Sequence, residues 1–400
     1  MTQLPEEFCS QTRQLMGEER FQRYLESFRQ DVPVSIRLNP RKVEGGRWKV
    51  EGGEPVPWCS DGYYLPQRPN FTMDPLLHAG CYYVQEAASM FVCHVLRQFV
   101  DSPVSMLDMC AAPGGKSTAA IATLPAGSTL CSNEPIRQRA NILAENIAKW
   151  GYPGCTVTNS YPRDIRKSKQ RFDVILCDVP CSGEGMFRKD EATIREWSPQ
   201  NVEKCWRLQR EIVTDAWACL NPGGLLIYST CTFNVKENEE NIQWILQEFD
   251  AEVLKVETKP EWHITGSLLP GFTEPVYRFI PGITRGEGLF LCAMRKSGRR
   301  KAPSTISFHH PPSTIHHLHP PSTIHDKVNL SYQQAIAYLR HEALVLPPDT
   351  PRGLVEVCFM GHPLGLVKNI GTRANNLYPK EWKIKTTHIP NDYEAVLRHT

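Results

Sequence analysis

The stretch that most constrains the fold is residues 106–116, which read MLDMCAAPGGK. Its apolar start predicts a strand that ends at Asp108, and a helix-like pattern follows over residues 117–122. A strand, a tight turn and a helix place backbone N–H groups and a helix N-terminus against a bound cofactor. Gly114 and Gly115 allow the backbone to approach such a ligand closely, because they carry no Cβ. The stretch therefore predicts a nucleotide-type ligand site at the end of a buried strand.

Two common nucleotide motifs fit this stretch poorly. The run Gly115, Lys116 and Ser117 resembles the end of a phosphate-binding P-loop, but Cys110 stands where that motif has its first glycine. A cysteine disfavours the positive φ that a phosphate-wrapping turn uses. The G-x-G-x-x-G pattern of dinucleotide sites is also absent from the stretch. A doubly wound fold that binds another adenosine cofactor fits better, with a P-loop ATPase and a ligand-free glycine turn as the alternatives.

Strand and helix patterns alternate from about residue 82 to residue 295. The expected strands are 104–107, 129–133, 155–158, 172–177, 225–229 and 289–294, and the expected helices are 85–99, 136–150, 199–219 and 235–249. Residues 221–224 predict a turn. This alternation predicts a parallel sheet with ligands at the carboxyl ends of its strands. Glu134 ends the second strand of the unit, about 20 residues past the glycines, where an acidic residue binds the ribose hydroxyls of an adenosine cofactor.

The flanking segments differ from this α/β region. The pattern of the first 30 residues predicts an amphipathic helix, and a short strand at residues 34–40 predicts that an α+β lobe follows. Arg37 in this strand is expected to be a surface charge on an edge strand, with contact to a phosphate as the alternative. Residues 299–327 repeat Pro-Ser-Thr-Ile and are rich in His and Pro, which predicts a solvated linker rather than a metal site. A small mixed-β domain is expected beyond it. The predicted domains are 1–80, 81–298, 299–327 and 328–400.

Composition excludes several protein classes. No apolar stretch approaches the ~18 residues of a membrane span, and the polar, acidic start of the chain does not resemble a secretory signal. Fourteen cysteines are spread over 400 residues without a C-x-x-C pair, which predicts reduced thiols in a cytoplasmic protein and no metal centre. The formal charge of +2 does not by itself announce a nucleic-acid partner.

Two of the cysteines, Cys181 and Cys231, follow the ends of expected strands. Most cysteines are small buried hydrophobes, but side chains at these strand ends project into the ligand crevice. A thiolate that adds to carbon 6 of a pyrimidine makes carbon 5 nucleophilic enough to accept a methyl group. A base then removes the carbon-5 proton and the thiolate leaves. Such a reaction requires the base to leave its stack.

The thiolate in turn requires an electropositive or hydrogen-bonded site. Lys116, Arg188 and Lys189 are the candidate sources of positive charge. Asp178 is the candidate for a hydrogen bond to the edge of the base, and it would help to protonate the ring as the thiolate adds.

Three motifs give the sequence a specific resemblance. Residues 108–116 (DMCAAPGGK), 178–185 (DVPCSGEG) and 229–232 (STCT) resemble motifs of the NOL/NOP/Sun family of RNA 5-methylcytosine methyltransferases. Residues 35–39, 85–89 and 286–290 are lesser matches, and residues 375–380 are similar to the C-terminal PUA-like RNA-binding domain of the bacterial 16S rRNA branch. The resemblance covers most of the chain from about residue 31 to residue 385, except the His/Pro-rich segment.

The resemblance implies a fold, a cofactor and roles for individual residues. It implies a doubly wound Rossmann-like methyltransferase sheet, an N-terminal α+β lobe, a PUA-like mixed-β domain and S-adenosylmethionine as methyl donor. Cys231 would be the nucleophile, Cys181 would assist product release, and Asp178 would lie between cofactor and base. Glu134 would bind the ribose of the cofactor. The residues implied to hold its methionine end are Cys110, Ala111, Ala112, Pro113, Gly114, Gly115 and Lys116.

The implied partner is RNA, either rRNA or a ribosomal subunit, bound by a monomer without membrane contact. A catalytically inactive RNA-binding protein is the alternative. Many family members carry an Asp that contacts adenine where Tyr161 stands here, so Asn159 or Asp164 are the candidate substitutes. Two basic groups are candidate RNA contacts: Arg295, Lys296, Arg299, Arg300 and Lys301, and then Lys368, Arg373, Lys380, Lys383 and Lys385 with Tyr378 and Trp382.

Overall fold

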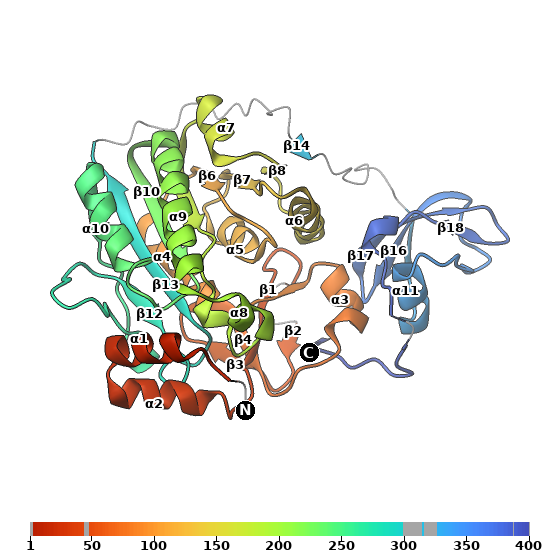
Figure 1. Ribbon diagram of the computed structural model, residues 1–400. Coiled ribbons are helices and arrows are strands. Elements are labelled where there is room, and N and C mark those ends of the chain that lie inside the picture. The colour runs from red at the N-terminus through yellow and green to blue at the C-terminus, as the bar shows by residue number, and fades with distance from the viewer. Residues whose placement is uncertain (1–2, 44–47, 299–313, 316–325, 387, 400) are drawn as a thin grey trace.

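The computed structural model describes residues 3–43, 48–298, 314–315, 326–386 and 388–399 (Figure 1). It consists of a large α/β domain, an N-terminal lobe packed beside it, and a smaller β-rich domain at the C-terminal end of the chain (Figure 1). Most of the predicted linker, residues 299–325, therefore lies outside the described residues. Thr314–Ile315 is the exception and forms the short strand β14, which pairs antiparallel with β8 (Cys155–Thr158).

Within the described part of the chain, the central sheet has nine strands, with β11-β13-β10-β9-β6-β7-β8-β14 as its order and β12 paired with β13. Strands β8, β7, β6, β9 and β10 are mutually parallel, whereas β13 pairs antiparallel with β10. The remaining bounds are β6 Ser105–Asp108, β7 Thr129–Asn133, β9 Phe172–Asp178, β10 Leu220–Thr230, β11 Ala251–Leu254, β12 Tyr277–Phe279 and β13 Leu289–Lys296. From β6 the chain adds β7 and β8 on one side of the sheet and then β9 and β10 on the other, so a crevice opens where the adjacent strands β6 and β9 end. This arrangement confirms the predicted doubly wound α/β fold.

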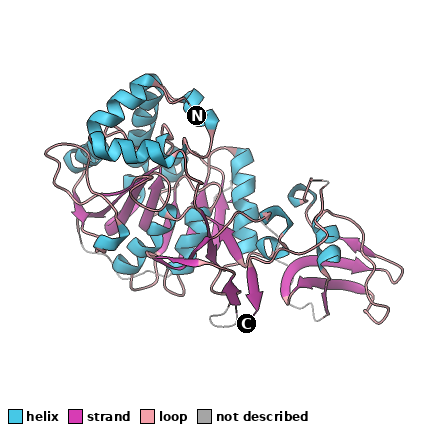
Figure 2. Ribbon diagram, turned by 90° about the horizontal axis from the view of Figure 1, so that it is seen from below, coloured by secondary structure: helices cyan, strands magenta, loops and turns pink. Residues whose placement is uncertain are grey.

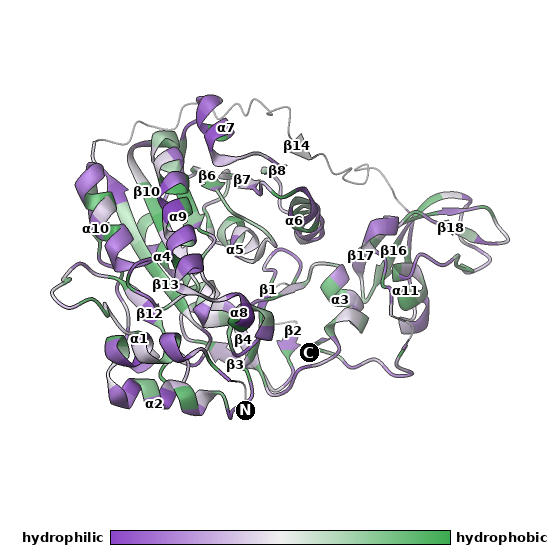
Figure 3. Ribbon diagram, in the orientation of Figure 1, coloured by the Kyte–Doolittle hydropathy of each residue, from purple (hydrophilic) through white to green (hydrophobic). Residues whose placement is uncertain are grey.

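The strands of the sheet are buried on both faces because their side chains alternate between two cores. Met106 and Leu107 are adjacent in β6, yet Met106 belongs to the core under α4 and α5, and Leu107 to the core under α9 and α10. Figure 3 shows the central strands as one of the most hydrophobic parts of the ribbon, and Figure 2 shows helices on both faces of the sheet. The helix bounds are α4 Phe91–Phe99, α5 Gly115–Thr123, α6 Arg137–Trp150, α7 Pro162–Lys167, α8 Glu191–Glu196, α9 Pro199–Cys219 and α10 Glu239–Glu248.

Three local predictions differ from the structure. The segment predicted as helix from residue 85 begins only with a 3₁₀ turn at Ala88–Met90, because the Glu86 carboxylate accepts the N–H of Ser89 at 3.1 Å. The helix predicted from residue 235 starts at Glu239, because Asn234 and Glu237 form a turn before it. The turn predicted at residues 221–224 lies inside β10, where the pairing with β9 shifts register.

The N-terminal lobe combines two helices with a four-stranded antiparallel sheet. Helices α1 (Glu6–Met16) and α2 (Glu18–Ser27) pack their aromatic face on the loops that follow β9 and β10. Phe8 lies 4.9 Å from Phe187, and Tyr24 lies 5.4 Å from Phe233, measured between ring centroids. The sheet order is β3-β4-β1-β5, with bounds β1 Val34–Leu38, β3 Glu54–Val56, β4 Cys59–Leu65 and β5 Tyr82–Val84. The short helix α3 (Pro75–His78) precedes β5.

Arg37 is not the surface charge of an edge strand that its sequence context predicts. Strand β1 lies inside its sheet, between β4 and β5, and the Arg37 side chain is fully buried. Its Nε donates to Gln85 Oε1 at 2.8 Å, its Nη2 donates to Thr118 Oγ1 at 2.7 Å, and its guanidinium stacks on the Trp150 ring. Arg37 therefore fastens the N-terminal lobe to α5, the helix that follows the MLDMCAAPGGK stretch.

The C-terminal domain is built on the sheet β15-β16-β17-β18. Its bounds are β15 Lys327–Asn329, α11 Tyr332–Leu339, β16 Gly353–Phe359, β17 His362–Asn369 and β18 Ala374–Asn376. The chain then returns to the N-terminal lobe, where β19 (Leu397–His399) pairs antiparallel with β2 (Trp48–Val50). The lobe and the domain share one apolar core, which includes Ile36 and Leu76 from the lobe and Ile336 and Val357 from the domain. Among the described helices, none has the length and apolar character needed to cross a membrane.

A buried ion pair connects the edge of the central sheet to α10. Arg278 on β12 donates through Nε to Glu239 Oε1 at 2.9 Å and through Nη2 to Glu239 Oε2, and both side chains are buried. Arg278 Nη1 also donates to the Phe233 carbonyl at 2.9 Å, directly after the β10 strand end.

We expect Arg278→Met to lower the free energy of unfolding by about 3–5 kcal/mol, because it leaves the Glu239 carboxylate buried without its cation. Urea denaturation followed by circular dichroism measures this change. Lys255→Met is the matched control, since Lys255 and Glu257 form an exposed ion pair, and it should leave the midpoint within error. Equal midpoints for the two variants would contradict the expectation.

Candidate active site

The loop after β6 is held across the ends of the neighbouring strands. The N–H of Met109 donates to the Leu176 carbonyl of β9, and the N–H of Ala111 donates to the Asn133 carbonyl of β7. The Ala112–Pro113 peptide is cis, and Gly114 has a φ of +112°, which a side chain would disfavour. The loop is thereby fixed directly over the crevice, and α5 begins from it.

Two buried carboxylates at this edge each keep one oxygen free of hydrogen bonds from the described residues. Asp108 Oδ2 accepts from Ser117 Oγ at 2.7 Å, whereas Asp108 Oδ1 has no such partner. Glu134 Oε1 accepts the N–H of Ile136 at 3.0 Å, whereas Oε2 has no hydrogen bond and lies 3.4 Å from Arg139 Nη1. Burial raises the pKa of Asp108 to about 7, although the bond from Ser117 opposes this rise. Both positions therefore suit a ligand that offers hydroxyl or amino donors.

Lys116 and Asp178 form an ion pair at the ends of α5 and β9. Lys116 Nζ donates to Asp178 Oδ2 at 2.8 Å, and the Ser229 hydroxyl donates to Asp178 Oδ1. Burial alone would lower the pKa of Lys116, but the Asp178 carboxylate, and to a smaller extent Cys231, raise it above its ordinary value. The lysine is therefore a fixed cation beside the thiols.

Cys181 and Cys231 meet at the ends of β9 and β10. Their sulfur atoms lie 3.2 Å apart, and the N–H of Cys231 donates to the Cys181 sulfur at 3.3 Å. The hydrogen bond with Cys231 and burial raise the pKa of Cys181 well above its ordinary value. Cys181 is therefore a thiol that can donate its S–H to the Cys231 sulfur.

Close backbone contacts and buried carboxylates support the two cysteine loops. The N–H of Gly185 donates to the Cys231 carbonyl at 2.8 Å. A Cβ on Gly288 would lie 2.5 Å from Gly185 Cα, so the two loops touch backbone to backbone. Glu184 accepts the N–H groups of Phe233 and Asn234. Burial raises the pKa of Glu237 to about 7, and the same carboxylate accepts the N–H of Ser182 at 3.0 Å.

These elements enclose a cavity of about 330 Å³. It brings together seven residues that the sequence predicts for the site: Cys110, Ala112, Lys116, Asp178, Cys181, Lys189 and Cys231. Of the other predicted cofactor residues, Ala111, Pro113 and Gly114 lie in the loop between β6 and α5, Gly115 begins α5, and Glu134 directly follows β7. The sequence did not assign roles to further lining residues, namely Glu86, Ser89, Arg139, Met186, Glu287 and Gly288. Glu86, Ser89, Glu287 and Gly288 lie in the segments 85–89 and 286–290, whose resemblance to family motifs is the sequence signal for them, whereas Arg139 and Met186 carry no such signal.

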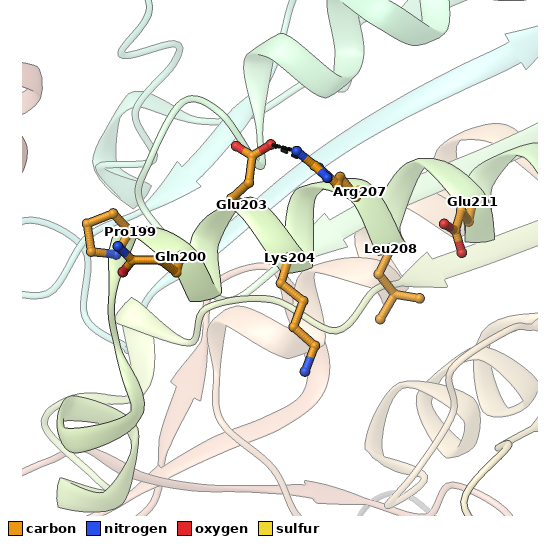
Figure 4. Close-up of a pocket in the computed structure, with 7 residues that line it drawn as sticks. All are labelled: Pro199, Gln200, Glu203, Lys204, Arg207, Leu208 and Glu211. Carbon is orange, nitrogen blue, oxygen red and sulfur yellow. Dashed lines mark hydrogen bonds and ion pairs between the residues drawn. The ribbon is translucent and has the colours of Figure 1, made fainter.

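A second hollow is larger, about 690 Å³, but carries none of the predicted site residues. It lies along the exposed side of α9, between Pro199 and Glu211, where Glu203 pairs with Arg207 (Figure 4). Its lining comes from one helix, so it brings no separate chain segments together. The smaller cavity at the strand ends is the candidate active site.

Other predicted contacts are placed as follows. Tyr161 is 57% exposed, and Asn159 Nδ2 donates to the carbonyls of Glu134 and Pro135. Asp164 pairs with Lys167 on α7. The described residues contain no group of three or more His, Cys, Asp or Glu side chains that could hold a metal ion.

The predicted RNA contacts are only partly free. Lys296 Nζ donates to the carbonyls of Trp217 and Leu220, and Arg295 Nη1 donates to that of Gly223. Both side chains therefore bond to the segment where α9 ends and β10 begins. Residues 299–301 lie outside the described part of the chain. In the C-terminal domain, Tyr378 is buried against Tyr338 and cannot stack on a base. Of the predicted cations there, Lys368, Arg373, Lys380, Lys383 and Lys385 are all exposed.

The strand order, the small-residue loop over the crevice and the acidic residue ending β7 define a Rossmann-like methyltransferase fold. A methyltransferase homologue from Pyrococcus horikoshii has a similar structure, with a TM-score of 0.62, 27% sequence identity, and coverage of 73% of this chain and 95% of that chain. The structure of PH0851 is likewise similar in fold, with a TM-score of 0.64, 23% identity, and coverage of 73% of this chain and 66% of that one.

Sequence comparison identifies the family. Residues 100–295 match the family described as 16S rRNA methyltransferase RsmB/F, residues 4–87 match the N-terminal domain of 16S rRNA methyltransferase RsmF, and residues 326–384 match the methyltransferase RsmF PUA domain. The chain is 32% identical, over an alignment of 438 positions including gaps, to ribosomal RNA small subunit methyltransferase F of Cronobacter sakazakii. The alignment covers 87% of this chain and 89% of that protein. The chain therefore belongs to the RsmB/F methyltransferase family, which confirms the resemblance seen in its motifs.

The match to other relatives is partial. The protein of the same name from Pectobacterium atrosepticum is 31% identical over 310 residues, which cover 74% of this chain and 63% of that protein. The corresponding protein from Erwinia tasmaniensis is 32% identical over 308 residues, with 73% of this chain and 63% of that protein covered. The chain thus spans less than two thirds of the length of these two relatives.

We expect Gly288→Ala to lower the free energy of unfolding by about 1–3 kcal/mol, because its Cβ would overlap Gly185 and the Phe233 ring. Urea denaturation measures the loss. Gly266→Ala is the control, since the nearest atom to its Cβ would lie 4.0 Å away. A Gly288→Ala variant as stable as the wild type would show that the loops do not touch.

Proposed function

We propose that the protein transfers a methyl group from S-adenosylmethionine to carbon 5 of a cytosine in 16S ribosomal RNA. The observation that carries the proposal is the pair of thiols 3.2 Å apart, beside the Lys116–Asp178 ion pair and at the crevice of a Rossmann-like fold. Membership of the RsmB/F family and the names of its relatives, which are small-subunit rRNA methyltransferases, support the RNA substrate. The exposed cations of the C-terminal domain suit contact with a phosphate backbone.

The residues at the crevice fit S-adenosylmethionine. The oxygens of Asp108 and Glu134 that accept no hydrogen bond are acceptors for its amino and hydroxyl groups. Gly114 carries no Cβ, so the cofactor can approach the backbone of this loop closely. When bound, the cofactor supplies an electrophilic methyl group. Lys116 and Asp178 line the cavity between this end of the crevice and the two thiols.

Cys231 is the proposed nucleophile. Its thiolate forms a bond to carbon 6 of the base, and the electron pair of the carbon 5–carbon 6 double bond makes carbon 5 the site of methyl transfer. Lys116 supplies a fixed positive charge in the same cavity. Asp178, held by Lys116 and Ser229, is proposed to hydrogen-bond the edge of the base.

Cys181 is proposed to assist release of the product. After methyl transfer, a base takes the carbon-5 proton, and the electron pair of that C–H bond restores the ring double bond and expels the Cys231 sulfur as a thiolate. The S–H of Cys181 can donate to that sulfur over 3.2 Å. This donor stabilises the leaving thiolate and accelerates cleavage of the carbon–sulfur bond.

The geometry also weighs against a P-loop ATPase. In a P-loop the lysine contacts phosphate and the following Ser or Thr contacts Mg²⁺. Here Lys116 Nζ bonds to Asp178 and Ser117 Oγ bonds to Asp108, so carboxylates occupy the places of the phosphates. The paired thiols weigh against an inactive RNA-binding protein, since RNA binding alone does not require them.

We expect Cys231→Ala to reduce methylation at least about 1,000-fold, because the alternative is attack by an unactivated ring carbon. Transfer of tritiated methyl groups to 16S rRNA transcripts measures the rate. Cys181→Ala should instead accumulate a protein–RNA adduct that survives denaturing electrophoresis. Cys205→Ala, a thiol on α9 outside the cavity, serves as control and should retain wild-type activity. Wild-type methylation by Cys231→Ala would refute the mechanism.

We expect S-adenosylmethionine, but not ATP with Mg²⁺, to raise the melting temperature. At a concentration 100 times the Kd, binding contributes about 2.7 kcal/mol of stability. Glu134→Gln should weaken the cofactor-induced rise, because an amide is a poorer acceptor for ribose hydroxyls. A rise with ATP alone would favour the P-loop alternative.

A further inference from the structure

Glu287 is a buried carboxylate at the cavity to which the proposed reaction gives no role. It lies in the loop between β12 and β13, next to Gly288, and lines the same cavity as Cys231 and Asp178. Its side chain is 2% exposed. Oε1 accepts from Arg188 Nη1 at 2.7 Å, whereas Oε2 has no hydrogen-bond partner among the described residues.

The other carboxylates that line the cavity are already engaged. Both oxygens of Asp178 accept hydrogen bonds, from Lys116 and from Ser229. Both oxygens of Glu86 accept backbone N–H groups, those of Ser89 and Glu287. Within the described lining, Glu287 Oε2 is therefore the carboxylate oxygen that accepts no hydrogen bond, whereas Asp178 reaches the base through a second lone pair of an oxygen that already accepts one. A buried acceptor without a partner is costly unless a ligand supplies the donor.

The loop holds this acceptor in a fixed position. The N–H of Glu287 donates to Glu86 Oε1 at 2.9 Å, and Gly288 packs against Gly185 in the loop that carries Cys181. Arg188 also donates to the carbonyls of Gln30 and Asp31, so its guanidinium is anchored to the N-terminal lobe. Burial raises the pKa of Glu287 to about 7, against the opposing charges of Arg188 and Lys189.

We infer that Glu287 Oε2 accepts a hydrogen bond from the exocyclic amine of the target base and so selects cytosine over uracil. The inference rests on the proposed function. Cytosine carries an amino donor at carbon 4, whereas uracil carries a carbonyl oxygen there. Arg188 pairs with Oε1 of this carboxylate, and Oε2 is the acceptor that faces the base. Oε2 attracts the amine of cytosine, whereas it repels the carbonyl of uracil and both oxygens stay unpaired. Glu287 is thus a specificity residue of the same cavity.

The test measures binding rather than turnover, so that it is independent of the covalent step. Bisulfite sequencing of 16S rRNA methylated by the wild-type protein first maps the target position. Absence of any methylated position would refute the proposed function itself. Three otherwise identical RNAs then carry cytidine, uridine or 2-pyrimidinone ribonucleoside at the mapped position, and their Kd values are measured with the full-length Cys231→Ala variant.

The variant should bind the cytidine RNA roughly 10- to 100-fold more tightly than the uridine RNA. Addition of Glu287→Gln should reduce this ratio to about threefold or less. Addition of Glu257→Gln, an exposed carboxylate that does not line the cavity, should leave the ratio unchanged. An unchanged ratio with Glu287→Gln, or an equal collapse with Glu257→Gln, overturns the inference.

The 2-pyrimidinone RNA tests the inference without altering Glu287, in case its variant does not fold. This base lacks both the amine and the carbonyl at carbon 4, so its affinity for Cys231→Ala should lie between those of cytidine and uridine. Affinity equal to that of the cytidine RNA would show that the amine is not recognised, and would overturn the inference.

Discussion

The parallel pairing of β6, β9 and β10 is the constraint on which the site depends. Parallel strands deliver their carboxyl ends to one edge of a sheet, so Asp108, Asp178 and Cys231 converge although they are far apart in sequence. The pairing is stable because both faces of these strands are covered, one by α4 and α5 and the other by α9 and α10. The packed sheet therefore fixes where the charged and nucleophilic residues lie, and the loops after the strands set the orientation of their side chains.

Much of this architecture could be predicted from the sequence. The apolar runs of the central strands and the helical periodicity between them require a covered parallel sheet, and the glycines after β6 mark where the backbone must approach a ligand. Cys181 and Cys231 stood out because each follows a strand end. Which of the two attacks the base could not be decided from spacing, since they occupy equivalent positions on adjacent strands.

What escaped prediction depends on contacts between distant segments. Arg37 reads as a surface charge, but it is buried, and Gln85 and Thr118 accept hydrogen bonds from its Nε and Nη2. In the sequence Glu287 is an acidic residue between two glycines. That one of its oxygens accepts no hydrogen bond can be seen only from the positions of Arg188 and Glu86 around it. Tyr378 reads as a stacking platform, yet it fills the core of its own domain. Local patterns do not carry such information, because each depends on residues from several elements.

The pairing of β19 with β2 has a consequence for the order of assembly during synthesis. Strand β2 leaves the ribosome early, whereas β19 follows all the other described strands. The N-terminal lobe must therefore wait with an unpaired strand edge while the rest of the chain is translated, and such an edge can recruit foreign strands. Pairing with β19 closes that edge once this strand has been translated.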